Sequence, residues 1–356
     1  MINQQIIQII FRCDASTTIG SGHVIRCLTL AKALAEKGAI CMFVCKKAEG
    51  DLIDQIKAEG HLVHVLPALT TSEQDWQHTT AFVKTLKHSP DWLIVDHYGL
   101  DVKWEDKLRH NVNKLMVIDD LANREHVCDL LLDQNMVHDM AHRYKGLLHG
   151  KCVELLGPKY ALLRPEFAAE KKRIMKRTFP PRHVLITFGG TDHENMALLS
   201  LKALNYTGYP GMVTLVAGQN NQNTTELELM CSKRLNTTFM QSTDKMAEIM
   251  RKADIAIGAA GMTTWERMCL GLPCVTIAVN ENQVEMAEFL GENHYSFYAG
   301  TSTSLTPQKL ATYLESVFFD SKKFKGIEKY AVDHVDGNGA TDIADILLDK
   351  DSILLK

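Results

Sequence analysis

The stretch FRCDASTTIGSGHVIRCLTLA, residues 11–31, decides the fold class of the N-terminal half of this chain. It starts at the end of an apolar segment, crosses a loop of small and polar residues, and continues into a helical pattern. The apolar residues of that pattern recur at helical spacing, and Gly38 follows them as a stop. A strand, a glycine-containing loop and a helix in this order predict the first unit of a parallel α/β sheet.

The same alternation continues along the whole chain. In the first half, apolar runs predict strands at residues 6–12, 39–45, 61–66, 92–96, 114–119 and 129–133, with a helix at 73–87 among the segments between them. In the second half, strands are predicted at 183–188, 212–217, near 239, 254–257 and 274–279, and helices at 195–205, 225–233, 244–252, 264–270, 282–290 and 340–348. Strands of this apolar character are typical of a parallel sheet that is covered on both faces.

Proline and glycine interrupt this rhythm once, between the two halves. The segment 156–182 holds Gly157, Pro158, Pro165, Pro180 and Pro181. We therefore predict an N-terminal Rossmann-like domain at 1–157, a linker at 158–182 and a C-terminal Rossmann-like domain at 183–356. The predicted fold is α/β, with the two domains facing each other across a cleft and the last helix crossing back onto the first domain.

Composition excludes several classes of partner. The chain has 356 residues, of which 46% are hydrophobic and 23% charged, with a formal net charge of -4 and a pI of about 6.4. A nucleic-acid-binding surface normally shows as a basic surplus, so no nucleic-acid partner is expected. No stretch reaches the roughly 18 apolar residues of a membrane span, so no membrane partner is expected either.

The cysteines and the N-terminus favour the cytoplasm. The chain has nine cysteines, an odd number, and several lie inside apolar runs, where cysteine is typically a small buried hydrophobe of a reducing compartment. The opening MINQQIIQII has no basic start and no small-residue cleavage site, so a first strand explains it better than a signal peptide.

The first candidate site is the loop that precedes the first helix. Gly20 and Gly22 allow the backbone to approach a ligand, and His23 falls at the start of the helix. The positive end of the helix disfavours protonation of an imidazole, which suits a general base. Asp14, in the same loop, could orient the imidazole or a sugar hydroxyl, and Arg26 follows one turn later as a substrate-binding candidate. The same pattern also fits a glycine-rich turn with a capping histidine.

Loops at the ends of later strands supply candidates for a nucleotide diphosphate. The loop TFGGTD offers the backbone of Gly189, Gly190 and Thr191, although an ordinary turn explains it equally well. The loop GAAGMTTWE offers backbone N–H groups and hydroxyls for a β-phosphate, from Ala260, Gly261, Met262, Thr263 and Thr264.

Three further polar residues complete the candidate list in the C-terminal half. Glu266 lies just inside a helix, where it could accept both hydroxyls of a ribose or only complement the helix dipole. Asn282 and Gln283 open the following helix. No metal or cofactor is expected, because His138 and His142 have the spacing of a two-histidine site but no evident third ligand.

At this point the motifs support a family resemblance. FRCDASTTIGSGHVIRCLTLA, LLGPKYALLRPEF, TFGGTD and AAGMTTWERMCLGLPCVTIAVNENQ closely resemble segments of the PseG family, in the family's order and over most of the chain. These proteins are UDP-2,4-diacetamido-2,4,6-trideoxy-β-L-altropyranose hydrolases of pseudaminic acid biosynthesis, a pathway that feeds flagellin or capsule glycosylation. The family is similar in fold to the peptidoglycan N-acetylglucosaminyltransferase, which has the GT-B architecture.

The resemblance implies specific roles. It implies metal-independent, inverting hydrolysis at the anomeric carbon of a UDP-sugar, with His23 as the catalytic base, Tyr98 as a tyrosine beside the sugar and Asn282 as an asparagine beside the sugar. Glu266 corresponds to the family's ribose-binding glutamate. Met262 departs from the family pattern, because a small hydroxyl residue is expected there. The resemblance also implies a monomer whose only partner is the small-molecule UDP-sugar.

Three other functions remain open at this stage, and one of them is a hydrolysing or non-hydrolysing UDP-sugar 2-epimerase. A GT-B glycosyltransferase would use the same UDP site with an acceptor hydroxyl in place of water, and a histidine base would serve both reactions. A UDP-sugar-binding protein without catalysis would keep its affinity and its biological function after replacement of His23.

Overall fold

The computed structural model describes residues 6–349 and divides the chain into two compact units. Among the described residues, unit 1 consists of 6–135, 139–163 and 338–349, and unit 2 of 136–138 and 164–337. The ends of the predicted domains, residues 1–5 and 350–356, lie outside the described residues. The segment predicted as a linker contains the helix α5 (Pro165–Lys171), which belongs to unit 2.

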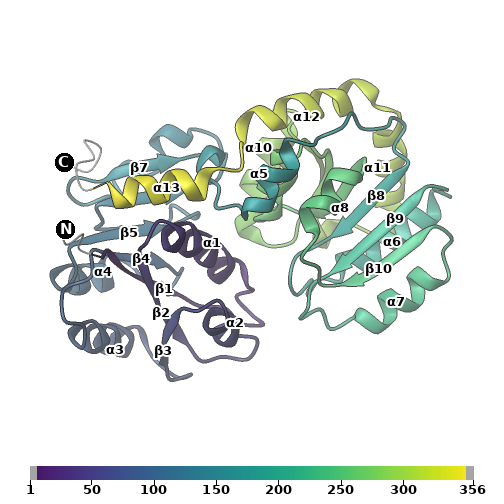
Figure 1. Cartoon of the computed structure of the whole chain (residues 1–356). Coiled ribbons are helices and arrows are strands. Elements are labelled where there is room, and N and C mark those ends of the chain that lie inside the picture. The colour runs from purple at the N-terminus through teal and green to yellow at the C-terminus, as the bar shows by residue number, and fades with distance from the viewer. Residues whose placement is uncertain (1–5, 350–356) are drawn as a thin grey trace. The chain divides into compact units, whose positions relative to one another are not determined.

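Unit 1 is built on a seven-stranded parallel sheet in the order β3-β2-β1-β4-β5-β6-β7 (Figure 1). Its strands are β1 (Gln8–Cys13), β2 (Ile40–Lys46), β3 (Leu62–Leu66), β4 (Trp92–Asp96), β5 (Lys114–Ile118), β6 (Leu130–Asp133) and β7 (Val153–Leu156). Its helices are α1 (Gly22–Glu36), α2 (Ile53–Ala58), α3 (Ser72–Lys84), α4 (Val102–Leu108) and α13 (Gly339–Leu348).

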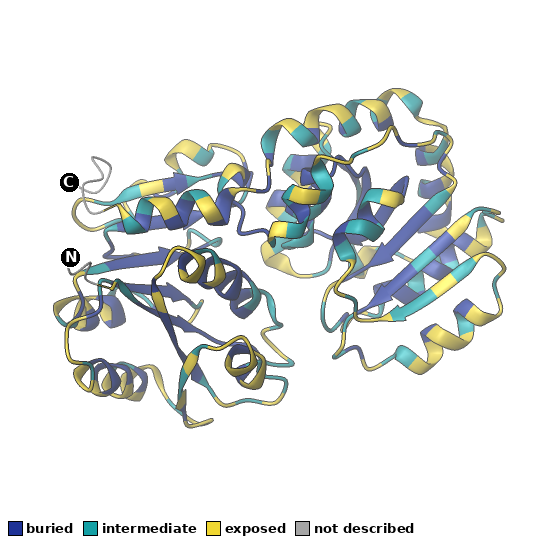
Figure 2. Cartoon of the chain, viewed as in Figure 1, coloured by how far each residue is buried: buried dark blue, intermediate teal, exposed yellow. Residues whose placement is uncertain are grey.

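Both faces of this sheet are covered, as its apolar strands require. Ile9 and Phe11 of β1 lie in one core with apolar residues of α1, α2 and α13. Ile10, between them in sequence, lies in a second core with residues of α3 and α4. Because side chains alternate along a strand, one continuous apolar run supplies both cores. Figure 2 shows the strands of the sheet as mostly buried beneath helices with exposed outer faces.

The helix α1 forms where the sequence pattern predicts it. Val24, Leu28 and Leu34 are buried on its inner side. Gly38 adopts φ +91°, a left-handed conformation that lacks a steric penalty only in glycine, and the chain turns there into β2. The strand–loop–helix unit read from residues 11–31 is therefore confirmed.

The last helix packs in unit 1, whereas the helices immediately before it in the chain belong to unit 2. Ile343 and Leu347 of α13 are buried in the core beside α1, and the indole N–H of Trp92 donates a hydrogen bond to the carbonyl oxygen of Leu347 at 2.9 Å. Figure 1 shows this yellow helix lying alongside α1, although their sequences are more than 300 residues apart. The C-terminal segment therefore contributes to the stability of unit 1.

Unit 2 is built on a six-stranded parallel sheet in the order β10-β9-β8-β11-β12-β13. Its strands are β8 (His183–Thr187), β9 (Met212–Ala217), β10 (Thr237–Gln241), β11 (Ile255–Ala259), β12 (Cys274–Ala278) and β13 (Phe297–Thr301). Besides α5, its helices are α6 (Met196–Tyr206), α7 (Thr224–Ser232), α8 (Met246–Lys252), α9 (Thr263–Cys269), α10 (Val284–Glu292), α11 (Pro307–Phe319) and α12 (Ser321–His334).

The strand order fixes which loops of unit 2 are neighbours. The strands β8, β11 and β12 lie side by side, and all are parallel. Their carboxyl ends therefore meet at one edge of the sheet, where the loops after them gather. The predicted fold class, two parallel α/β units, is confirmed by both sheets.

Candidate active site

The loop after β1 holds the first predicted residues at the carboxyl edge of unit 1. Ser16 and Gly20 exchange backbone hydrogen bonds across this loop, at 3.3 and 2.8 Å. Gly20 adopts φ +84°, and the side chain of Ser16 accepts hydrogen bonds from the backbone of Thr18 and Ile19. The compact loop delivers the chain into α1 so that His23 is its second residue. Gly20 is thus required for the turn itself.

His23 is paired with a buried carboxylate. Its Nδ1 lies 2.5 Å from Oδ1 of Asp96, and His23 and Asp96 are 7% and 0% exposed. Asp96 is the last residue of β4, directly beside Cys13 at the end of β1. Because a carboxylate only accepts hydrogen bonds, we assign the imidazole proton to Nδ1. Nε2 then carries the lone pair, so His23 is set up to accept a proton at that atom.

Arg26 supports this pair from one helical turn further along α1. Its Nε and Nη2 each donate to an oxygen of Asp96 at 2.5 Å, and its Nη1 donates to Asp120 at 2.9 Å. Burial alone would raise the pKa of Asp96, but the charge of Arg26 and the hydrogen bonds from Arg26 and His23 outweigh it and hold that pKa well below its ordinary value. Asp96 therefore stays ionised and keeps the imidazole in one tautomer.

Arg26 was predicted to bind substrate, and the structure gives it a different role. Its side chain is buried, and its guanidinium is occupied by two carboxylates. A guanidinium with such partners has little left to offer a ligand. Arg26 thus acts behind His23, as a support for Asp96.

Tyr98 lies against the imidazole of His23, and its place beside the sugar stays a prediction. The rings of Tyr98 and His23 meet edge to face, with centroids 4.6 Å apart and an interplanar angle of 83°. Partial burial and the nearby charge of Asp120 raise the pKa of Tyr98, so its hydroxyl keeps its proton at neutral pH. About a third of Tyr98 is exposed, 37%, so the ring is accessible beside the base.

Asp14 has other partners than the imidazole. Its carboxylate accepts hydrogen bonds from the guanidinium of Arg12 and from the backbone N–H of Lys46, each at 2.7 Å, and lies 3.2 Å from Nε2 of His97. Asp96, and not Asp14, therefore contacts Nδ1 of His23, while the alternative that Asp14 holds a sugar hydroxyl stays a prediction. Asp14 and His97 instead join the loop after β1 to the loop after β4.

Sequence reasoning missed Asp96 for an identifiable reason. Asp96 is the last residue of the strand predicted at 92–96, but the order of strands in a sheet cannot be read from one sequence. Only the pairing of β1 with β4 places Asp96 beside the loop that holds His23. An acidic residue at the carboxyl end of a strand is the signal that could have found it.

In unit 2, the loop after β8 is stabilised by its own acidic residue. Asp192 accepts hydrogen bonds from the backbone N–H groups of Met196 and Ala197, the first residues of α6, at 2.8 and 3.0 Å. Burial raises the pKa of Asp192 to about 6. Since these N–H groups already have an anionic partner, α6 offers little to a phosphate.

The remaining candidates of that loop are its backbone groups. Gly189 adopts φ +82°, and the loop packs tightly against Gly218, where a Cβ would lie 2.1 Å from the carbonyl oxygen of Gly190. Thr191 precedes the capping Asp192. Any phosphate contact of Gly189, Gly190 and Thr191 would therefore use groups of the loop, because the first N–H groups of α6 are bound to Asp192.

The loop after β11 differs, because none of its side chains caps the helix that follows. Met262, at the N-cap of α9, makes no side-chain cap hydrogen bond. Ala260 and Gly261 lead into this helix, and the hydroxyl oxygens of Thr263 and Thr264 accept hydrogen bonds from Arg267 at 3.1 and 3.0 Å. The predicted phosphate residues of this loop therefore lie together.

Glu266 is partly accessible on the same helix. Its side chain is 15% exposed and lies 3.5 Å from the guanidinium of Arg164. Burial raises the pKa of Glu266, and the charge of Arg164 partly offsets this. The carboxylate has unused acceptor positions for a pair of neighbouring hydroxyls, because Arg164 reaches only one of its oxygens.

The loop after β12 joins this group through Gln283. A Cβ on Gly261 would lie 3.7 Å from the amide nitrogen of Gln283, so the two predicted residues are neighbours. The amide oxygen of Gln283 accepts a hydrogen bond from the backbone of Val279 at 3.1 Å. Asn282 is exposed on the short 3₁₀ helix Glu281–Gln283. It belongs to unit 2, whereas His23 belongs to unit 1.

The two histidines weighed as metal ligands have separate carboxylate partners. His138 lies 3.1 Å from Glu292, and His142 lies 2.7 Å from Asp139. Within residues 6–349 no group of three or more His, Cys, Asp or Glu side chains is arranged to hold a metal ion. Over the same part of the chain, no helix combines the length and the apolar character that crossing a membrane requires.

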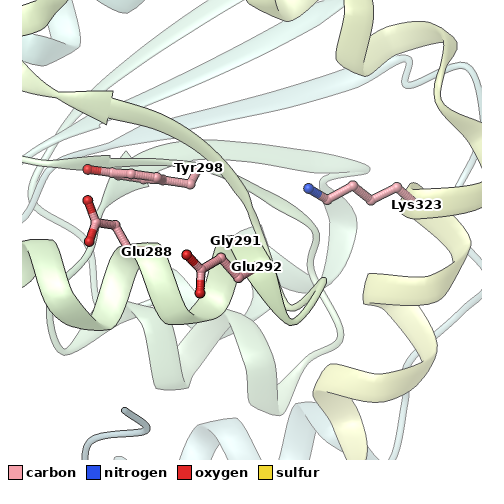
Figure 3. A pocket seen from close by; sticks show the side chains of 5 residues that line it. All are labelled: Glu288, Gly291, Glu292, Tyr298 and Lys323. Carbon is pink, nitrogen blue, oxygen red and sulfur yellow. The ribbon is translucent and has the colours of Figure 1, made fainter. Parts of the chain in front are cut away.

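A pocket in unit 2 lies apart from these loops. Its lining comes from the end of α10, the start of β13 and the start of α12, as Figure 3 shows. The lining residues are Glu288, Gly291, Glu292, Tyr298 and Lys323. Because β13 begins here, the pocket lies at the amino edge of the sheet, whereas the predicted site lies at the carboxyl edge.

Comparison with known proteins shows which proteins this chain resembles. Residues 183–345 match the model of the glycosyltransferase family 28 C-terminal domain. The chain is 29% identical to the UDP-2,4-diacetamido-2,4,6-trideoxy-beta-L-altropyranose hydrolase of Campylobacter jejuni, over 81% of this chain and 97% of that protein. It is 24% identical to the spore coat polysaccharide biosynthesis protein SpsG of Bacillus subtilis, over 94% of this chain and 96% of that protein.

Solved structures share the fold at low sequence identity. The crystal structure of Acinetobacter baumannii MurG aligns with a TM-score of 0.69 and 15% identity, over 96% of this chain and 99% of that one. A UDP-N-acetylglucosamine 2-epimerase described as putative, from Listeria monocytogenes, aligns with a TM-score of 0.56 and 12% identity, over 95% of both chains. The GT-B fold and the resemblance found in the motifs are both confirmed by these comparisons.

Proposed function

The chain is a relative of the PseG family of UDP-sugar hydrolases, and on that basis we propose that it hydrolyses UDP-2,4-diacetamido-2,4,6-trideoxy-β-L-altropyranose at the anomeric carbon. The products are UDP and the free sugar. The observation that carries the proposal is the buried Asp96–His23 pair, whose imidazole contacts the accessible ring of Tyr98.

The proposed reaction is a single displacement. Nε2 of His23 takes a proton from water as the water oxygen attacks C1 of the sugar. The bond between C1 and the β-phosphate oxygen breaks, and its electron pair leaves with UDP. Attack from the side opposite to the leaving group inverts C1. No metal takes part in this proposal, because hydrogen-bond donors of the protein neutralise the leaving group.

Asp96 assists the displacement without touching substrate. A carboxylate on Nδ1 keeps the proton at that atom, so Nε2 is free to act as the base. It also stabilises the imidazolium that forms after proton transfer. Arg26 and Asp120 in turn hold Asp96 and the phenol of Tyr98 in place.

The loops of unit 2 are proposed to bind the UDP. The backbone of Gly189, Gly190 and Gly261 and the hydroxyls of Thr263 and Thr264 are the donors available to the two phosphates. Glu266 accepts the hydroxyls of the ribose. Asn282 and Gln283 are proposed to lie near the sugar end of the same ligand.

The proposal extends to the cellular location, the oligomeric state and the pathway of the protein. We place the protein in the cytoplasm, as a monomer that supplies pseudaminic acid biosynthesis and thereby flagellin or capsule glycosylation. All nine cysteines, which lie in the described part of the chain, are free thiols, as is usual in a reducing compartment. Light scattering coupled to size-exclusion chromatography tests the monomer, and a mass near 80 kDa, about twice that of the 39.9 kDa chain, would contradict it.

The second candidate is a glycosyltransferase with an acceptor hydroxyl in place of water. It is favoured by the fold shared with MurG and by the match to a glycosyltransferase family domain. The His23 base would serve that reaction equally well. The relationship to the Campylobacter jejuni hydrolase, over most of both chains, favours water.

The experiment that separates them measures UDP release from purified protein in the presence of EDTA. The substrates are the 2,4-diacetamido-trideoxy-altrose UDP-sugar and UDP-N-acetylglucosamine, and proton NMR identifies the anomer released first. We expect rapid release from the first substrate only, with an inverted anomer. Tight UDP binding without release from either substrate would favour the transferase, and turnover lost with EDTA would exclude the metal-free reaction.

A further inference from the structure

Arg267 on α9 is one of the largest fully buried side chains of the molecule, at 1% exposure. Its Nη2 donates to the carbonyl oxygen of Ala259 at 2.7 Å and to the hydroxyl of Thr264 at 3.0 Å. Its Nη1 donates to the hydroxyl of Thr263 at 3.1 Å. The guanidinium therefore lies directly beneath the loop proposed to hold the phosphates.

The charge of Arg267 is not neutralised by an ion pair. Across residues 6–349, no acidic side chain lies within 4 Å of its guanidinium nitrogens, and its buried Nε has no hydrogen-bond partner. Burying an ionised group without an opposite charge is costly, and buried charges are normally paired. Its hydrogen-bond partners are all neutral, and the carboxylate of Glu266, one residue earlier in the helix, acts on it only through space. A buried cation without a direct ion pair indicates that an anion is supplied from outside the fold.

The direction of the hydrogen bonds around Arg267 also favours an anion as the ligand. A guanidinium only donates, so the oxygens of Thr263 and Thr264 act as acceptors toward Arg267. Each hydroxyl keeps its own proton, which it can donate away from Arg267. Thr263 is partly exposed, so its proton can reach a ligand at the surface of the loop. Arg267 thus turns these hydroxyls into donors, which an anion requires.

The neighbouring strand leaves room for this arrangement. A Cβ on Gly258 would lie 2.7 Å from Nη1 of Arg267 and 2.6 Å from the carbonyl oxygen of Thr187. Contacts this short do not occur between real atoms of these kinds, so any side chain at this position would displace Arg267 or β8. The position of the guanidinium is consequently built into β11 as well as into α9.

We propose that Arg267 is a positioning residue for the diphosphate, and this inference rests on the proposed UDP-sugar function. Arg267 fixes Thr263 and Thr264 as donors and supplies the buried positive charge that stabilises the phosphates and the developing charge of the departing UDP. Arg267 is proposed to contribute to the binding of the diphosphate and not to the binding of the nucleoside. This contribution should therefore be absent when the ligand is uridine, which carries no phosphate.

The test compares the affinities of UDP and uridine by isothermal titration calorimetry. For Arg267→Met we expect the ratio of the two affinities to fall about tenfold to a hundredfold, the usual size of a hydrogen bond to a charged group. Arg267→Lys should recover part of the loss, because lysine keeps the charge but not the two-armed geometry. Glu266→Gln is the matched control: it should weaken UDP and uridine by the same factor and leave the ratio unchanged.

Thr263→Val is the second variant, since it keeps the shape of the side chain and leaves Arg267 in place even if Arg267→Met does not fold. We expect it to lower the ratio as well. An unchanged ratio in the folded variants, with normal UDP binding by the unmodified protein, would overturn the role of Arg267. Absence of UDP binding by the unmodified protein would instead contradict the proposed function, so the two failures are distinguishable.

Discussion

At the scale of single residues, the chemistry of this protein depends on how one histidine is held. The carboxylate of Asp96 contacts both Nδ1 of His23 and the guanidinium of Arg26. Three hydrogen bonds, two from Arg26 and one from His23, and the charge of Arg26 overcome the cost of burying Asp96, which alone would raise its pKa. The result is a charged, immobile acceptor that leaves His23 one basic atom.

Asp96→Asn should lower kcat by roughly 10²–10⁴, the usual contribution of a general base. The amide group of asparagine can donate to Nδ1, which would move the imidazole proton to Nε2 and remove the base. Affinity for UDP should stay near that of the unmodified protein, because Asp96 lies in unit 1, outside the proposed UDP loops. Steady-state kinetics and calorimetry measure the two quantities.

The control for that variant is Asp91→Asn. Asp91 also accepts a hydrogen bond, from the backbone of Gln8 at 2.8 Å, but it precedes β4 and so lies at the amino edge of the sheet. Its kcat should be unchanged. If Asp96→Asn turned over at the normal rate, His23 would not need Asp96 and the proposed base would be in doubt.

His23→Ala should lose a similar factor in kcat while binding UDP normally, since His23 is proposed to touch only water and sugar. Single-turnover measurements at saturating substrate give the rate of the chemical step directly. A variant that bound substrate and kept the normal rate would fit neither the hydrolase nor the transferase proposal.

A second buried histidine determines stability at alkaline pH. Nδ1 of His126 lies 2.6 Å from Glu105, and its Nε2 lies 3.8 Å from Asp119. Burial alone would lower the pKa of His126, but these carboxylates outweigh it and raise the pKa to about 9. The stabilisation is therefore complete below the unfolded pKa of about 6.5 and is lost as pH rises through about 9.

His126→Gln tests this dependence. We expect a loss on the order of 3 kcal/mol in the free energy of unfolding at pH 6, which should become much smaller at pH 10. Urea denaturation at both pH values measures it. A loss of equal size at the two pH values would show that packing, and not charge, accounts for the role of His126.

At the scale of elements, close approach of backbone to backbone shapes the loops of unit 2. Gly218 contacts the loop after β8, and Gly258 faces both β8 and Arg267. Neither glycine has a positive φ, so space and not backbone conformation requires them. The glycine of the loop after β11, Gly261, differs because it has ordinary contacts only.

Gly218→Ala should destabilise unit 2 by about 1–3 kcal/mol, the usual cost of overpacking, because its Cβ would overlap the backbone of Gly190. Gly261→Ala should change stability by less than about 1 kcal/mol, since the nearest atom to its Cβ would be the amide nitrogen of Gln283 at 3.7 Å. Thermal unfolding of both variants measures the difference. Equal stability of the two would show that the loop after β8 can move aside.

At the scale of the whole molecule, the chain order and the units do not coincide. The chain leaves unit 1 for residues 164–337 and returns for its last described helix, α13. Ile343 and Ala344 on that helix are fully buried in the core beside α1. Unit 1 is therefore complete only when the C-terminal segment is present.

Ile343→Ala should consequently destabilise unit 1 by about 2–5 kcal/mol, the usual cost of such a cavity. Asp345→Ala, on the same helix, removes only an exposed ion pair with Lys37 and should cost less than about 1 kcal/mol. Differential scanning calorimetry should resolve the change in the transition of unit 1. A shift confined to the transition of unit 2 would contradict the placement of α13.

Local sequence patterns were enough to predict the fold class and the loops of the candidate site. Apolar runs and helical periodicity predicted the two parallel α/β units, because alternation and burial are imposed residue by residue. The order of strand, glycine-containing loop and helix predicted His23 and the loop around Thr263 as parts of the site. The motifs in these loops also carried the family resemblance.

The contacts between side chains, in contrast, could be found only in the folded chain. β1 and β4 are neighbours although almost 80 residues separate them in the chain, and this pairing selects Asp96 over Asp14 as the partner of His23. The sequence does not distinguish Arg267 from other helical residues, because its burial and its lack of an ion pair are properties of the folded chain. Strand order and burial arise from long-range packing, which a local pattern does not encode, so the partners of each predicted residue emerged only from the folded chain.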